Sequence, residues 1–142
     1  MLFRSRVALT ANCAPPSPNA PNRERMLAQN FPKYIAAGVK LVLATDTGLH
    51  PGHTFGSGEH VELARWVQLG LPPAQAIVAA TKTPAELMGL TDLGTLAAGK
   101  RASFIVLNGN PLDDIHNTRA IADVYLDGMK IDRAALLRTW RP

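Results

Sequence analysis

The sequence predicts an α/β fold built around a buried parallel strand, and three observations support this prediction. Residues 39–45 form a nearly unbroken apolar run that ends at Asp46, and such a run is typical of a parallel strand with helices on both faces. A helical pattern and Gly38 precede the run, and further helical patterns follow it. After Leu90 the pattern changes from helical to extended, which predicts a smaller β-rich part.

The beginning of the chain is expected to lack regular structure. Residues 14–21 contain four prolines, and proline suits neither the interior of a helix nor a central strand. Residues 1–21 are therefore predicted to form an irregular N-terminal segment. Asn22 can cap a helix whose apolar residues recur at helical spacing, and Pro32 predicts a kink or a restart of that helix near Asn30.

A loop rich in glycine follows the apolar strand and leads into three helical patterns. The loop covers residues 49–58, and a helix is predicted over residues 59–69 with Gly70 in a Schellman-type end. A second helix is expected to begin near Pro73. A third, short helix is predicted from a capping box at residues 83–86, in which a threonine precedes a glutamate by three positions.

The last third of the chain carries strand and hairpin signals. Residues 103–107 and 121–126 are predicted strands, and the Asp-Gly pair at residues 127–128 is a strong signal for a two-residue hairpin turn. The turn leads into an extended segment at residues 129–131. Residues 133–140 are predicted to form a final short helix.

Composition excludes several classes of protein. The chain has 142 residues and a net charge of +4, and its basic residues are scattered, whereas a nucleic-acid-binding domain concentrates them on one face. Cys13 is the only cysteine, so neither an internal disulfide nor a cysteine-based zinc site is expected. No apolar stretch has the length of a membrane-spanning helix, and we expect a cytoplasmic location.

An ordered series of motifs resembles the C-terminal part of the amidohydrolase superfamily, nearest to its imidazolonepropionase-like and prolidase-like hydrolases. The first motif contains Thr45-Asp46-Thr47-Gly48, and the others follow it in order and with ordinary spacing. Each motif alone is a weak signal, but the series is specific. The matching segments are residues 38–48, 59–63, 70–76, 79–81, 84–87, 89–90, 93–96, 99–102 and 110–112.

This resemblance implies a fold and a role for Asp46. It implies the C-terminal fragment of a (β/α)8 barrel over residues 22–90, followed over residues 91–142 by part of a small β-sandwich lobe with a C-terminal tail. By the same resemblance, Asp46 is the carboxylate at the end of the eighth strand. In the family this group helps to hold a divalent metal ion, most often zinc, and accepts a proton from the attacking water.

The resemblance also implies ligands that this chain does not contain. In the family, a His-x-His pair, a lysine or carboxylate and two further histidines come from earlier strands. A zinc site needs three or four ligands, and Asp46 is one, so we expect no tightly bound metal in the chain alone. The sequence is expected to represent an incomplete and inactive part of a longer enzyme.

Four histidines are candidates for site residues. His50 and His53 follow Asp46 closely in a glycine-rich loop, and they are expected to contact substrate in a complete barrel rather than to ligate metal, because such a loop supplies few hydrogen bonds to fix a ligand. His60 either contacts substrate or anchors the preceding loop at the start of a helix. His116 is expected on the surface.

Two functions remain open at this point. The resemblance implies a metal-dependent hydrolase that cleaves a C–N bond in a cyclic amide, an amidine or an X-Pro-type substrate. In that case the missing barrel strands come from upstream sequence or from a partner chain. The alternative is a non-catalytic or vestigial fragment that packs on another chain.

Overall fold

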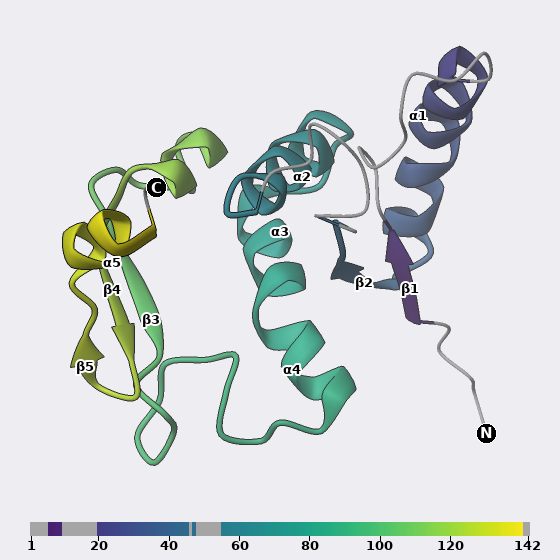
Figure 1. Cartoon of the computed structure of the whole chain (residues 1–142). Coiled ribbons are helices and arrows are strands. Elements are labelled where there is room, and N and C mark those ends of the chain that lie inside the picture. Colours follow the sequence, from purple (N-terminus) through teal and green to yellow (C-terminus); the bar gives the residue numbers. More distant parts are fainter. Residues whose placement is uncertain (1–5, 10–19, 46, 48–54, 141–142) are drawn as a thin grey trace.

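The computed structural model describes residues 6–9, 20–45, 47 and 55–140 of the chain (Figure 1). The described elements form an α/β unit followed by a small antiparallel sheet. In chain order they are β1 (Arg6–Leu9), α1 (Ala20–Ala36), β2 (Lys40–Leu43), α2 (Gly58–Gln68), α3 (Pro73–Ala80), α4 (Lys82–Met88), β3 (Phe104–Leu107), the 3-10 helix η1 (Ile115–Arg119), β4 (Ile121–Leu126), β5 (Met129–Lys130) and α5 (Arg133–Trp140).

Strands β1 and β2 pair in parallel and are joined through α1. The register places Arg6 opposite Lys40 and Leu9 opposite Leu43, so the unit is a βαβ crossover, as a parallel pair requires. The prediction of an irregular segment over residues 1–21 is therefore wrong at β1. Four residues are a weak signal on their own, and this strand forms because β2, more than 30 positions later, supplies its hydrogen-bond partners.

Helix α1 differs from the prediction at two prolines. It begins at Ala20, before the proposed cap Asn22, and Pro21 fits there because the first turn of a helix has no use for its N–H group. Pro32 lies inside the helix, which continues unbroken to Ala36. The expected restart near Asn30 is absent, since burial of Phe31 beside it stabilises the helix through packing.

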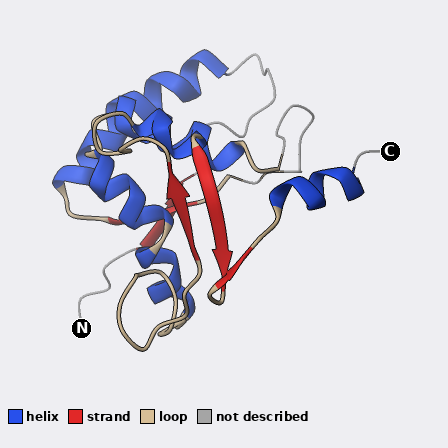
Figure 2. Ribbon diagram, turned by 90° about the vertical axis from the view of Figure 1, so that its left-hand side faces the viewer, coloured by secondary structure: helices blue, strands red, loops and turns tan. Residues whose placement is uncertain are grey.

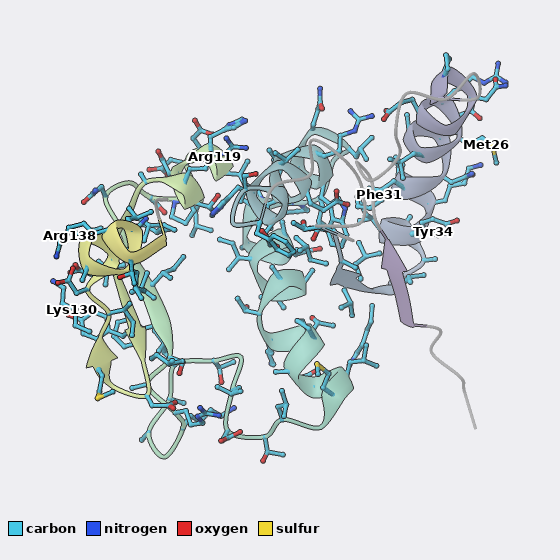
Figure 3. All side chains as sticks on the ribbon, in the orientation of Figure 1. Met26, Phe31, Tyr34, Arg119, Lys130 and Arg138 are labelled. Carbon is cyan, nitrogen blue, oxygen red and sulfur yellow. The ribbon has the colours of Figure 1, made fainter. Side chains whose placement is uncertain are left out.

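The core lies between α1, β2, α2 and α3. Phe31 of α1 and Trp66 of α2 are fully buried, with ring centroids 5.6 Å apart, and Leu41 of β2 joins the same cluster. Figure 3 shows Phe31 on the side of α1 that faces α2, whereas Met26 points away from the core. Aromatic pairs of this kind stabilise a core beyond the area they bury.

The ends of the helices follow their local sequence to different degrees. Helix α2 ends in a Schellman motif, because Leu71 N–H donates to Trp66 O and Gly70 N–H to Val67 O. The capping box predicted for residues 83–86 does not form. Helix α4 begins earlier, at Lys82, without a side-chain cap, and Glu86 forms ion pairs with Lys82 and Lys40 instead.

The small sheet has the order β3-β4-β5 and is antiparallel throughout. The predicted hairpin is present: Asp127 and Gly128 both have positive φ, as a two-residue turn between twisted strands requires. Phe104 and Tyr125 stack across β3 and β4 with centroids 4.7 Å apart. Helix α5 follows and projects away from the sheet (Figure 2). Among the described residues, no helix is long and apolar enough to cross a membrane.

The two parts of the fold meet where η1 packs against α2. Ile115 of η1 is buried in the same cluster as Leu63 and Trp66 of α2. Helices α2, α3 and α4 therefore lie between the βαβ unit and the antiparallel sheet (Figure 1).

Candidate active site at the end of strand β2

The chain turns directly after β2, and two threonines form this turn. The hydroxyl of Thr47 donates a hydrogen bond to Thr45 Oγ1 at 2.7 Å, and Thr47 N–H donates to the same oxygen at 3.3 Å. Asp46 stands between them in the sequence and lies outside the described residues. The two threonines that precede and follow Asp46 in the sequence are thus bonded to each other.

The first residue of α2 lies against this turn. A Cβ atom at Gly58 would be only 2.4 Å from Thr47 Oγ1 and 3.6 Å from Thr45 Cβ. Only glycine permits this approach without displacing the threonine pair. The N-terminal turn of α2 therefore sits directly on the end of β2.

A carboxylate is buried one turn further along α2. Glu62 has 1% of its surface exposed, and Trp66 Nε1 donates to Glu62 Oε1 at 2.8 Å. Sequence reasoning missed this group, because a glutamate near a helix start is ordinarily an exposed residue that favours the helix dipole. The signal was present in the spacing: Glu62 and Trp66 are four positions apart and so share one face of the helix.

His60 connects α2 to the small lobe. Its Nδ1 lies 3.0 Å from the hydroxyl of Thr118 in η1. Burial lowers the pKa of the His60 imidazole below its ordinary value, the guanidinium of Arg119 lowers the pKa further, and Glu59 acts in the opposite direction. The described contact is therefore with the lobe, which neither earlier interpretation anticipated, and substrate contact by His60 stays a prediction.

The remaining candidates are not brought together by the described structure. His50 and His53, like Asp46, lie outside the described residues. His116 is exposed, as expected, and its Nδ1 lies 2.7 Å from Asp114. Within the described ranges, no three His, Cys, Asp or Glu side chains are placed to hold a metal ion.

Comparison with known proteins gives consistent matches to hydrolases. Imidazolonepropionase of Deinococcus radiodurans is 39% identical over 94 residues, which are 63% of this chain and 24% of that protein. The structure of molinate hydrolase gives a TM-score of 0.77 at 32% identity and covers 88% of this chain and 31% of that one. A Xaa-Pro dipeptidase structure gives a TM-score of 0.70 at 32% identity, over 80% of this chain and 27% of that one.

The chain thus spans about a quarter to a third of the length of these proteins. The sequence model of the amidohydrolase family matches residues 6–131, which extend from β1 to the strand after the hairpin. Because this match includes the βαβ unit, the helices and the antiparallel sheet, the chain belongs to the amidohydrolase family.

Proposed function

We propose that this chain contributes the strand-end carboxylate, Asp46, to a hydrolase that cleaves a C–N bond in a small cyclic amide, amidine or X-Pro-type substrate. Membership of the amidohydrolase family supports the reaction class. The observation that supports the site most directly is the packing at the end of β2, where Thr45 and Thr47 bond to each other and Gly58 of α2 lies against them. A carboxyl end of a parallel strand is also where α/β barrels place their chemistry.

Asp46 would act as the proton acceptor in this reaction. A carboxylate beside the attacking water accepts its proton and passes it to the leaving nitrogen. Family membership also predicts a divalent ion, zinc in most cases, and Asp46 would be one of its ligands. The described residues offer no further ligand set, so the other ligands would come from another segment or a partner chain.

We further propose that β1, α1 and β2 are the last strands and connecting helix of a (β/α)8 barrel, and that the chain alone is inactive. In a closed barrel every strand has two neighbours, whereas β2 pairs only with β1 among the described strands. A groove of about 370 Å³ lies beside β2 and is lined by apolar residues that include Val39, Leu41 and Val78. The cytoplasmic location stays a prediction.

One observation fits the alternative, a non-catalytic fragment that packs on another chain, as well as it fits the catalytic proposal. Large apolar side chains are exposed on both parts of the molecule: Met88 of α4 is 72% exposed and Met129 of β5 is 70% exposed. Exposed apolar side chains mark a surface that a partner covers where they form a contiguous patch. They do not distinguish a partner that completes an active site from one that does not.

A chimera tests the catalytic proposal. Residues 6–131 of this chain would replace the matching segment of the Deinococcus radiodurans imidazolonepropionase, and turnover of its substrate would be measured. We expect activity in the chimera and a loss of at least about a hundredfold in kcat for Asp46→Asn, because general-base catalysis contributes about that much or more. Asp113→Asn in the lobe, at an exposed aspartate, is the matched control and should leave activity unchanged.

Two results would count against the proposal. If the Asp46→Asn chimera kept full activity, the assignment of Asp46 as proton acceptor would be wrong. A chimera that folds, as judged by circular dichroism, and yet shows no turnover would favour the non-catalytic alternative.

A further inference from the structure

The hydrogen bonds around His60 determine where its ring carries a proton. His60 Nδ1 lies 3.0 Å from Thr118 Oγ1, and the same oxygen lies 2.8 Å from the carbonyl oxygen of Ile115. Both distances are those of hydrogen bonds. A threonine hydroxyl has one hydrogen to donate, so it can donate to only one of these two partners.

The carbonyl of Ile115 is the partner that must receive this hydrogen. A carbonyl oxygen has no proton of its own, and at 2.8 Å two oxygens without a hydrogen between them would repel each other. The imidazole, in contrast, can donate from either nitrogen. The hydroxyl of Thr118 therefore donates to Ile115, and His60 Nδ1–H donates to Thr118. In the neutral ring this leaves Nε2 without a proton.

The fold keeps this arrangement in place. Thr118 has 5% of its surface exposed, and Ile115 belongs to the buried core cluster. Thr118 is consequently shielded from solvent, and its two hydrogen-bond partners in the described structure are Ile115 and His60. The ring of His60 is half-buried and belongs to the first turn of α2, the same turn whose Gly58 contacts the threonine pair at the end of β2.

We propose that Thr118 is a positioning residue of the small lobe, which holds His60 as its Nδ1–H tautomer and so presents Nε2 as a hydrogen-bond acceptor to a ligand group that bears an N–H or O–H donor. The tautomer follows from the contacts alone, whereas the ligand part rests on the proposed function. The chemistry selects amide, amino and hydroxyl groups. It discriminates against carboxylate and phosphate, which have only acceptor atoms when ionised.

Nitrogen-15 solid-state NMR of the full chain, labelled at histidine and sedimented, tests the tautomer without requiring a monomer. His60→Asn identifies the His60 signals by their disappearance. We expect a protonated Nδ1 and an unprotonated Nε2 at a pH of about 8, above the ordinary pKa of histidine. Thr118→Val should abolish this preference, and Thr118→Ser, which keeps the hydroxyl, should retain it. An Nε2–H ring in the wild-type chain, or an Nδ1–H ring that survives in Thr118→Val, would overturn the proposal.

The ligand part is tested separately in the active chimera. Asparagine at position 60 mimics Nδ1 as a donor and lacks the atom at Nε2, whereas glutamine reaches the Nε2 position and can offer a carbonyl there. We expect KM to rise about two- to tenfold in His60→Asn, as for the loss of one hydrogen bond, and to recover in His60→Gln. An unchanged KM in His60→Asn would overturn the ligand part, even with the tautomer established and the Asp46 result positive.

Discussion

At the scale of single residues, the candidate site depends on close contacts around one position. Thr45 and Thr47 bond to each other on either side of position 46, and Gly58 lets α2 approach them. The hydrogen bond between these two threonines is a finding of the structure, and Asp46, which stands between them in the sequence, lies outside the described residues. The close approach of Gly58 to Thr45 and Thr47 could not be predicted from the sequence, because a loop separates these residues along the chain.

His60 predicts a pH dependence of stability. Its folded-state pKa is lowered, chiefly by burial and next by Arg119, with Glu59 opposing both. The unfolded chain therefore binds a proton more readily, so stability falls as the pH drops through the unfolded value of about 6.5. Above that value the group contributes no pH dependence. Urea unfolding at pH about 8 and about 5 measures the difference, which His60→Asn should reduce.

The carboxylates provide an internal check on this result. The backbone N–H of His116 lowers the pKa of Asp114, and Arg101 lowers that of Asp127. Each of these carboxylates stabilises the fold while it is ionised. That contribution to the free energy of unfolding is lost only as the pH falls below about 4, the ordinary pKa of a carboxyl group. A pH dependence in His60→Asn equal to that of the unsubstituted chain would show that His60 does not cause it.

At the scale of elements, the sequence predicted the features that depend on local signals and missed those that depend on long-range contacts. The hairpin at Asp127-Gly128, the Schellman end of α2 and the boundaries of β4 and α5 were all predicted, because each depends on neighbouring residues. Strand β1 was missed because its partner lies more than 30 residues away. The capping box at Thr83 and Glu86 does not form because α4 begins at Lys82, so Thr83 lies inside the helix and cannot serve as its N-cap.

The candidate site was predictable only in part for the same reason. Motif order and the end of an apolar strand were enough to select Asp46. The spacing of Glu62 and Trp66 places them on one face of α2 but does not indicate that this face is buried. The contact between His60 and Thr118 spans 58 positions. Such contacts follow from the way α2 packs on η1, and that packing is set by the whole core.

A substitution at Gly58 tests the close packing of the first turn of α2 against the end of β2. Gly58→Ala should destabilise the chain by about 1–3 kcal/mol, the cost of overpacking a close contact, although alanine is otherwise the better residue in a helix. The new Cβ would displace Thr47 Oγ1 from its bond with Thr45. Adding Thr47→Ala removes the obstructing oxygen and should recover part of the loss in denaturant unfolding. Equal stability of Gly58→Ala and the unsubstituted chain would contradict this packing.

At the scale of the whole molecule, the described structure has an unpaired strand edge and exposed apolar side chains. The described part of β2 pairs on one side only, and alternate N–H and C=O groups of a parallel strand point to opposite neighbours. An apolar groove lies beside this strand, and large apolar side chains are exposed on α4 and β5. An open strand edge of this kind is a template for pairing with another chain. We therefore expect the isolated chain to self-associate or to bind a partner that supplies further strands.

Light scattering combined with hydrogen exchange on the purified full chain tests this account most directly. Light scattering should give a mass above that of one chain. In any monomer that is present, those amides of residues 41–43 that point away from β1 should exchange rapidly. A monodisperse monomer in which every amide of residues 41–43 is strongly protected would contradict the account, because it would mean that β2 already has both of its neighbours.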